Sequence, residues 1–199
     1  MHLLASLTSP YARKLRAVAG ELALDLPVVP TAPMENPPAL VAANPLRKVP
    51  ALILGDGTSL IDSPVIAGYL LAQVPDQPLM PSHGMAHWRM RSFEALTDGI
   101  LDAAVGLVFG RAAQLDATTV PSLQRATVAI DLAVKALLAA HAGVGHDSFG
   151  YHDICTVVAL DYLDFRHPGI DWRAQPGLVA LHARHADRPS LVATRPPTG

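Results

Sequence analysis

The sequence predicts two domains of different fold class, an α/β domain over residues 1–75 and an all-α domain over residues 84–199. A short apolar run, a glycine-rich turn and a second short run give residues 51–61 the pattern of a β-hairpin. Three prolines within residues 75–81 then interrupt the chain, because proline cannot continue a helix. Beyond the linker predicted at residues 76–83, apolar residues follow helical spacing and strand-like alternation does not recur.

The elements expected before the hairpin alternate between strand and helix. Residues 2–7 and 26–29 are apolar and short enough to be strands. Between them, residues 11–24 place apolar side chains on one face of a helix. Residues 31–44 are rich in Pro, Ala and Asn, and this composition predicts a loop with one helical turn.

The first domain is organised around residues 44–70. The hairpin turn is Gly-Asp-Gly, in which glycine adopts positive φ without strain. A helix is expected to start directly after the second strand, at an Asp-Ser-Pro sequence. Ser63 suits the N-cap and Pro64 the first helical position, where no backbone donor is required.

The second domain is predicted to consist of helices. Residues 83–111 and 121–141 carry apolar side chains at helical spacing. Residues 151–165 are apolar nearly all round, which is typical of a helix buried on every side. Residues 176–186 are expected to form a last short helix.

Composition restricts the classes of partner. The chain has 199 residues and a net charge of −2, and its longest basic run is Arg47-Lys48, so nucleic acid is not expected to bind. Cys155 is the only cysteine, which excludes an intramolecular disulfide and is compatible with a reducing cytosol. No basic n-region precedes the apolar N-terminal run, and no charge-free segment has the length of a bilayer span, so no membrane partner is expected.

The order of three motifs resembles the glutathione S-transferase family. Ser9-Pro10-Tyr11-Ala12 follows the first strand, where glutaredoxin-like proteins carry Cys-Pro-Tyr-Cys; Val49-Pro50 opens the hairpin, and Asp62-Ser63 follows it at a helix start. The resemblance covers nearly the whole chain. It implies a thioredoxin-like N-terminal domain with a four-stranded mixed sheet between helices, an all-α C-terminal domain, a cytoplasmic location and a homodimer.

Ser9 is the predicted catalytic residue. Its hydroxyl and the neighbouring backbone N–H groups lie at the positive end of a helix, a place that favours an anion. The resemblance implies that this anion is the thiolate of glutathione. Lowering a thiol pKa by about two units requires ~2.7 kcal/mol, and one charge-assisted hydrogen bond with a helix end suffices without a metal. Two alternatives stay open: Ser9 only caps the helix, or Thr8 supplies the hydroxyl.

Five further residues are expected to bind glutathione. The resemblance implies a cis Val49-Pro50 bond, which directs the Val49 N–H and C=O at the tripeptide backbone. Asp62 is expected to pair with the γ-glutamyl ammonium, and Ser63 with its carboxylate at the helix N-terminus. Lys48 is expected to pair with the glycine carboxylate. Each assignment has a structural alternative. Pro50 could simply open a strand, Ser63 could cap the helix with Asp62 beside it, and Lys48 could be a solvated surface lysine.

The predicted reaction is attack of the glutathione thiolate on an apolar electrophile, with glutathione as co-substrate. The pocket for this electrophile is expected from four residues of the second domain: Leu101, Ala104, Val105 and Phe165. A non-catalytic glutathione-binding or scaffold protein is one alternative, and a lyase or dehalogenase using glutathione is another. A glutathione-dependent oxidoreductase is a weaker one, because mixed-disulfide chemistry requires a thiol where Ser9 stands.

Asp153 is assigned to folding. A carboxylate at the start of an all-apolar helix must be hydrogen-bonded to be tolerated. Members of the family carry a Ser/Thr-x-x-Asp capping box here, whereas this chain has Gly150 at the cap position. Glycine is an acceptable N-cap, and we expect Asp153 to bond back to the backbone at Gly150. Cys155, in the same helix, is expected to be a buried core thiol.

The nine histidines include two pairs at helical spacing, His83 with His87 and His182 with His185. Neither pair is accompanied in the sequence by the three or four ligands that a zinc site requires. The sequence therefore predicts no metal site.

Overall fold

The computed structural model describes residues 1–145 and 148–197, which divide between two units. The first unit comprises Met1–Leu79 and the chain from Arg188 onward, and the second comprises Met80–Asp187. The first crossing between the units lies within the predicted linker, residues 76–83. The prediction of one all-α domain over residues 84–199 requires a correction at its end, since the chain from Arg188 onward belongs to the first unit.

The first unit is built on a four-stranded mixed sheet in the order β2-β1-β3-β4, as predicted. Its strands are β1 (His2–Ala5), β2 (Val28–Pro30), β3 (Ala51–Ile53) and β4 (Ser59–Leu60). β1 pairs with β2 in parallel and with β3 antiparallel, with Leu4 opposite Ala51. β3 and β4 form the predicted hairpin, with Leu52 opposite Leu60.

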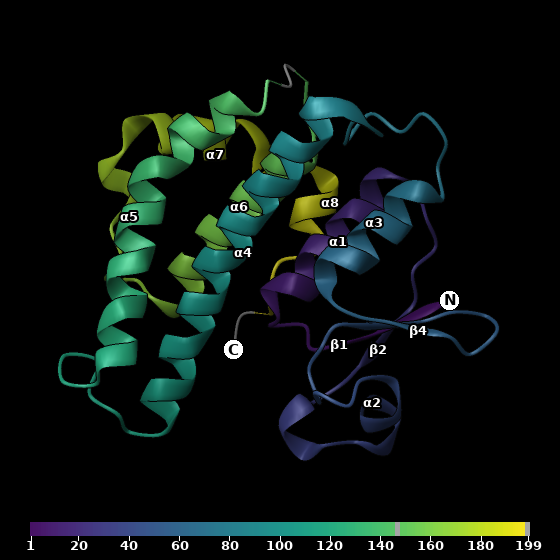
Figure 1. Cartoon of the computed structure of the whole chain (residues 1–199), viewed down its shortest axis with the longest axis horizontal. Helices are drawn as coiled ribbons and strands as arrows, with labels where there is room; N and C mark the ends of the chain where they lie inside the picture. Colours follow the sequence, from purple (N-terminus) through teal and green to yellow (C-terminus); the bar gives the residue numbers. More distant parts are fainter. Residues whose placement is uncertain (146–147, 198–199) are drawn as a thin grey trace. The chain divides into compact units, whose positions relative to one another are not determined.

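Helices cover both faces of this sheet. In Figure 1, α1 (Pro10–Glu21) and α3 (Ser63–Ala72) lie on one face, and α2 (Pro38–Ala43) lies on the other. Residues 31–44 hold more helix than the single turn expected, because a 3₁₀ turn at Pro33–Glu35 precedes α2. Proline occupies the first turn of each, where its fixed φ favours a helix start.

A short helix, α8 (Pro189–Val192), brings the end of the chain back to α1. The Arg188 guanidinium donates to both carboxylate oxygens of Glu21, at 3.0 and 2.6 Å, and the Ser190 hydroxyl donates to Glu21 at 2.5 Å. A Cβ on Gly20 would lie 3.2 Å from the Ser190 Cβ, so the approach of α8 to α1 relies on a glycine. These contacts explain why residues beyond Arg188 join the first unit.

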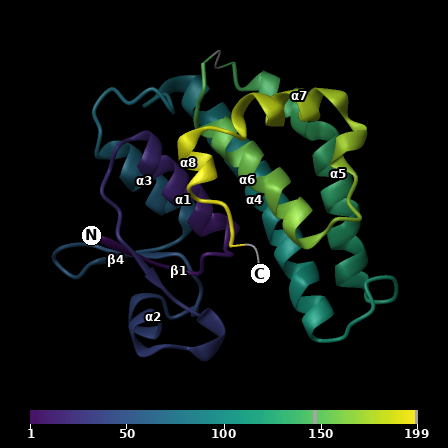
Figure 2. The same cartoon turned by 180° about the vertical axis from the view of Figure 1, so that it is seen from behind.

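The second unit consists of helices. Figures 1 and 2 show α4 (Gly84–Ala112) and α5 (Pro121–Gly143) running side by side, joined by α6 (Tyr151–Arg166) and α7 (Pro176–His185). Every residue from Tyr151 to Leu160 is buried, which confirms the prediction of a helix enclosed on all sides. A 3₁₀ turn at Trp172–Ala174, not foreseen from the sequence, places Trp172 in the core.

By length and apolar composition, α5 alone among the described helices could cross a membrane. Its outer face nevertheless carries an exposed ion pair, in which the Lys135 Nζ lies 2.7 Å from Asp131. Its other face is buried within the unit through Leu123, Ile130, Val134 and Leu137. This division between a buried and an exposed face is that of a helix packed on the surface of a domain.

Candidate functional site

The strand directions bring the predicted site residues of the first unit to one edge of the sheet. Because β3 is antiparallel to both β1 and β4, the start of β3 lies beside the ends of the other two. Ser9 follows the end of β1, Val49-Pro50 precedes the start of β3, and Asp62-Ser63 follows the end of β4. Three segments that are distant in sequence thus converge on the N-termini of α1 and α3.

Ser9 is the N-cap of α1, as one alternative stated. Its Oγ accepts a hydrogen bond from the Ala12 backbone N–H at 3.3 Å. A hydroxyl that accepts one bond still carries a proton to donate, so capping leaves the catalytic alternative open. The Thr8 hydroxyl lies 3.0 Å from the Ser6 Oγ. Which of the two hydroxyls faces a bound thiol stays a prediction.

The Val49-Pro50 peptide bond is cis, as the resemblance implied. No hydrogen bond to the Val49 backbone N–H or C=O is formed by residues 1–145 or 148–197. The buried Asn44 orders the preceding loop, because its amide donates to the Lys48 carbonyl at 2.9 Å and accepts from the Leu46 N–H at 3.0 Å. Lys48 itself is exposed, and its side chain forms no ion pair with any described residue.

The start of α3 differs by one residue from the prediction. Asp62, not Ser63, is the N-cap, and its carboxylate accepts a hydrogen bond from the Ser63 N–H. Ser63 is then the first helical residue and Pro64 the second. Asp62 is the N-cap because its carboxylate reaches the Ser63 N–H, one of the first-turn N–H groups that lack a partner within the helix. The Ser63 hydroxyl does not satisfy this N–H. The Ile61-Asp62 peptide bond that leads into this cap is also cis.

The two side chains at the start of α3 have opposite environments. Asp62 is exposed, so the carboxylate oxygen that does not cap the helix is open to solvent. Ser63 is only 1% exposed, and its hydroxyl has no hydrogen-bond partner in the described part of the chain. A buried hydroxyl without a partner costs about 1–3 kcal/mol relative to a satisfied one. This hydroxyl is therefore positioned to donate to an acceptor that the described residues do not supply.

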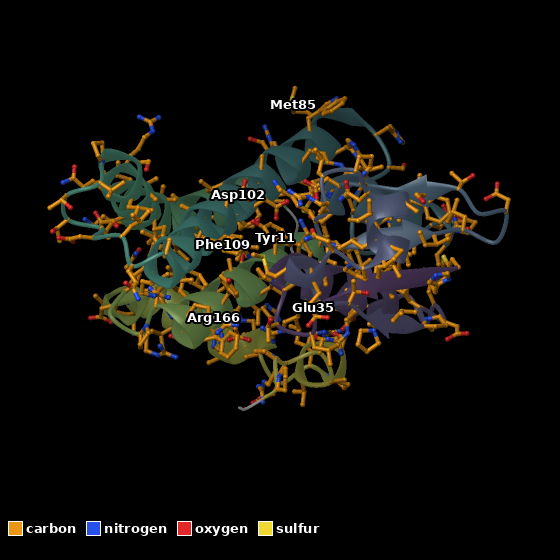
Figure 3. The ribbon with its side chains drawn as sticks, turned by 90° about the horizontal axis from the view of Figure 1, so that it is seen from below. Tyr11, Glu35, Met85, Asp102, Phe109 and Arg166 are labelled. Atoms are coloured by element: carbon orange, nitrogen blue, oxygen red, sulfur yellow. The ribbon has the colours of Figure 1, made fainter. Side chains whose placement is uncertain are left out.

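The four residues predicted for an electrophile pocket all lie in the second unit. Leu101 and Ala104 are fully buried, whereas Val105 and Phe165 are partly accessible. The Arg166 guanidinium stands 4.0 Å from the centre of the Phe165 ring. Figure 3 shows Arg166 on α6 together with the exposed side chains of Asp102 and Phe109 on α4. Their role toward a substrate stays a prediction.

The second unit contains a hollow that sequence reasoning missed. It has a volume of about 440 Å³ and is lined by Leu107, Arg111, Thr127, Arg166, His167, Pro168, Gly169 and Ile170. The His167 Nε2 donates to the Ala104 carbonyl at 2.8 Å, and its Nδ1 accepts from Arg111 at 3.0 Å. Burial, and the positive charges of Arg111 and Arg166, lower the pKa of His167. No sequence signal marks this site, because His167 follows the end of α6 and contacts α4.

Asp153 forms the predicted capping box. Its Oδ2 accepts from the Gly150 N–H at 2.8 Å, and its Oδ1 lies 2.8 Å from the His141 Nε2. Burial acts to raise the pKa of Asp153, but the hydrogen bond from His141, the charge of His152 and the Gly150 N–H together lower it. The prediction that Cys155 is buried is confirmed. The contact with His141 could not be foreseen, since that residue belongs to another helix.

The sequence of this chain is similar to those of known glutathione S-transferases. The family described as glutathione S-transferase, N-terminal domain, matches residues 3–78. The uncharacterized GST-like protein YibF of Escherichia coli (strain K12) is 30% identical over 200 residues, which cover 99% of each chain. The chain belongs to the glutathione S-transferase family. The family assignment made from the order of the motifs is thereby confirmed.

Solved structures of glutathione S-transferases match the whole chain. A family member from Pseudomonas fluorescens Pf-5 with bound glutathione is 37% identical, covers 99% of each chain and superposes with a TM-score of 0.88. A glutathione S-transferase from Methylobacillus flagellatus KT with glutathione bound is 34% identical, with a TM-score of 0.89 over 98% of this chain and 99% of that one. The predicted thioredoxin-like domain followed by a helical region is thus confirmed.

Proposed function

We propose that this chain is a glutathione transferase that binds reduced glutathione at the edge of the sheet and activates its thiol for attack on an apolar electrophile. The observation that carries the proposal is the buried Ser63 hydroxyl, which lacks a partner among the described residues and sits beside the open carboxylate of Asp62. The two similar structures with bound glutathione support it.

The start of α3 suits the γ-glutamyl end of glutathione, which carries a carboxylate and an ammonium on one carbon. The Ser63 hydroxyl donates to the carboxylate, and the positive end of the helix stabilises its charge. The Asp62 oxygen that does not cap the helix pairs with the ammonium. One helix start thus offers complementary partners to both charges.

The other two segments suit the rest of the tripeptide. The Val49 N–H and C=O have no hydrogen-bond partner among the described residues, and they offer the backbone of glutathione a strand-like pair of hydrogen bonds. The Lys48 ammonium, exposed and without an ion-pair partner in the described residues, is available to the glycine carboxylate. The thiol then lies at the N-terminus of α1.

Ser9 stabilises the thiolate in this proposal. The thiol proton leaves to solvent, the Ser9 hydroxyl donates to the sulfur anion, and the N-terminus of α1 adds a favourable field. The sulfur lone pair then forms a bond to the electrophilic carbon, and the leaving group departs with the electron pair of the broken bond. Four residues of the second unit, Leu101, Ala104, Val105 and Phe165, are proposed to contact the apolar electrophile.

Calorimetric titration with reduced glutathione tests the binding step. We expect the wild-type chain to bind one glutathione and Ser63→Ala to bind it about 10- to 150-fold more weakly, the equivalent of ~1.5–3 kcal/mol for a hydrogen bond to a charged group. Ser92→Ala, on the exposed surface of α4, is the matched control and should bind as the wild type does. Absence of binding, or equal affinity for Ser63→Ala, would overturn the proposal.

A screen of model alkyl and aryl electrophiles tests the chemical step in the same protein. Formation of a thioether conjugate supports transfer. Binding without turnover for any of them would favour a non-catalytic glutathione-binding protein, and release of a halide or cleavage of a carbon–heteroatom bond without a stable conjugate would favour a dehalogenase or lyase. Disulfide reduction would favour an oxidoreductase.

We also propose that the protein is a cytosolic homodimer. The Cys155 thiol is buried and forms no disulfide in the described chain, which is compatible with a reducing compartment. The mass in solution, from light scattering coupled to size-exclusion chromatography, tests the dimer, and a mass of one chain would contradict it.

A further inference from the structure

A cluster of three histidines and one aspartate lies in the second unit, among residues that take no part in the proposed glutathione site. His141 comes from the last turn of α5, His152 and Asp153 from the first turn of α6, and His185 from the end of α7. All three imidazoles turn their Nε2 atoms toward the Asp153 carboxylate. The distances are 2.8 Å from His141 and 3.4 Å from His185 to Oδ1, and 3.6 Å from His152 to Oδ2.

Capping alone does not account for this convergence. The Gly150 N–H satisfies the Asp153 Oδ2 at 2.8 Å, and one imidazole is enough to satisfy Oδ1. His152 and His185 nevertheless bring two further imidazoles to the same carboxylate. Basic nitrogens gathered around a carboxylate in this number are a ligand set for a divalent transition-metal ion.

The spacing of the ligand atoms of His141, His152 and Asp153 fits one metal ion. Zinc binds imidazole nitrogen and carboxylate oxygen at about 2.0–2.2 Å, so the ligand atoms of a tetrahedral site lie roughly 3.3–3.5 Å apart. The His152 Nε2 lies 3.6 Å from Oδ2, close to this value, whereas the 2.8 Å contact of the His141 Nε2 with Oδ1 must widen. The His185 Nε2 approaches Oδ1 at 3.4 Å and is an outer partner of the carboxylate. The ligand atoms of His141, His152 and Asp153 all lie within 4.8 Å of one another.

The residues around the cluster fix the orientation of the side chains and leave the cluster accessible to an ion from solvent. The Phe93 ring packs edge-on against both His141 and His152, at centroid distances of 5.7 and 6.2 Å. The bond from Gly150 fixes the orientation of the Asp153 carboxylate, as outer partners of metal ligands do. The His141 and His185 side chains are 17% and 13% exposed, whereas those of His152 and Asp153 are 2% and 3% exposed. An ion can therefore reach the buried pair past the two outer imidazoles.

We propose that His141, His152 and Asp153 bind one divalent transition-metal ion, with zinc as the preferred metal, and that His185 acts as an outer partner of the Asp153 carboxylate. Three protein ligands leave the fourth position of a tetrahedral ion to solvent. Bound metal ties the end of α5 to the start of α6. The prediction of no metal site considered only histidines paired within one helix, and this ligand set spans two helices.

Metal titration of untagged, chelator-treated protein in the absence of glutathione tests the proposal. Zinc is titrated by calorimetry, and cobalt(II) is titrated by visible absorption, because tetrahedral cobalt gives intense bands that octahedral cobalt does not. We expect one ion per chain, tetrahedral cobalt bands and a higher melting temperature with zinc. His141→Ala, which removes a partly exposed ligand, should weaken binding at least tenfold and abolish the rise in melting temperature. His185→Ala, which removes an outer partner of the Asp153 carboxylate, should weaken binding about tenfold.

The controls are His83→Ala and His87→Ala, a histidine pair at the start of α4, together with His2→Ala beside the terminal amine. These three should bind zinc as the wild type does. No binding, octahedral cobalt spectra, or a loss of affinity that follows His2, His83 or His87 in place of His141 and His185 would overturn the proposal. Since the glutathione titration uses other residues, either proposal can fail without the other.

Discussion

Two helices of this protein start with an acidic residue and use it in different ways. At the start of α6, Asp153 is buried, and each of its oxygens has a partner from the protein, Gly150 on one side and His141 on the other. At the start of α3, Asp62 is exposed and caps the helix with one oxygen, while the adjacent Ser63 hydroxyl is buried without a partner in the described chain.

In our proposal, this difference distinguishes a helix start that stabilises the fold from one that binds a ligand. Most buried polar groups in proteins are hydrogen-bonded, so a saturated carboxylate such as Asp153 stabilises the fold. A buried group left unsaturated costs stability unless a ligand completes it, and such exceptions concentrate at functional sites. Mutations at the two helix starts should therefore affect different measurements.

Asp153→Ala should have the largest effect and should act on stability. It removes the cap of α6 and leaves the Gly150 N–H and the His141 imidazole without their acceptor, a loss of about 2–4 kcal/mol. Denaturant unfolding in metal-free buffer measures it. Asp131→Ala, in the exposed pair with Lys135, is the control and should cost less than about 1 kcal/mol. If Asp153→Ala unfolds with the same free energy as the wild type, Asp153 does not stabilise the fold and the two helix starts do not differ as we propose.

Asp62→Asn should give the opposite profile. Asparagine keeps a cap acceptor of similar strength, so the free energy of unfolding should change little. The ligand ammonium loses its counter-charge, so glutathione should bind about 10- to 150-fold more weakly, corresponding to ~1.5–3 kcal/mol. Asp56→Asn, in the hairpin turn where its carboxylate accepts from the Thr58 N–H, is the control and should leave affinity unchanged. A destabilised Asp62→Asn with full affinity would reverse our assignment.

Ser9→Gly tests the start of α1, where we propose that one hydroxyl both caps the helix and stabilises the bound thiolate. Glycine costs an N-cap only a few tenths of a kcal/mol, so α1 should persist while the hydroxyl is lost. The pKa of the bound thiol should rise by about one to two units, and the conjugation rate at neutral pH should fall roughly ten- to a hundredfold. The pH profile of thiolate absorbance measures this shift. Profiles that superimpose on the wild type would move the role to Thr8, which Thr8→Val then examines.

Glu21 should have the smallest effect on the free energy of unfolding, because its carboxylate is hydrogen-bonded but partly exposed. Burial acts to raise its pKa, but the hydrogen bonds from Arg188 and Ser190 outweigh burial and lower it. The stability from this lowered pKa is present above the unfolded value of about 4.3 and is lost as the pH falls through the folded pKa. We expect no more than about 1 kcal/mol in chemical unfolding between pH 6 and pH 3. Glu21→Gln should remove that part of the pH dependence, and an unchanged dependence would show that the contact contributes nothing.

Local sequence patterns were sufficient for most of the fold. The hairpin around Gly55-Asp56-Gly57 and the all-apolar α6 each depend on neighbours within a few residues, and both occur as predicted. The cap of α3 was displaced by one residue, because both Asp62 and Ser63 are good caps and the choice depends on backbone geometry. The motif order was also sufficient to place Ser9, Val49 and Ser63 at one edge of the sheet.

Contacts between distant helices were beyond sequence reasoning. His141 and His185 lie 12 and 32 residues from Asp153, on two other helices, so no spacing rule connects them. The hollow lined by Arg111 and His167 and the pair of Arg188 with Glu21 are long-range contacts of the same kind. Such contacts depend on how separate helices pack against each other. The spacing of residues within a single sequence gives no information about this packing.

The return of α8 to α1 makes the helical unit an insertion within the sheet unit. The chain leaves the sheet unit after Leu79 and re-enters it at Arg188, so two covalent connections join the two units. A fragment ending at Leu79 would lack the segment that covers α1 and would leave Glu21 without its guanidinium partner. To isolate the glutathione S-transferase sheet unit as an independent module, the polypeptide would have to be spliced from Leu79 to Arg188.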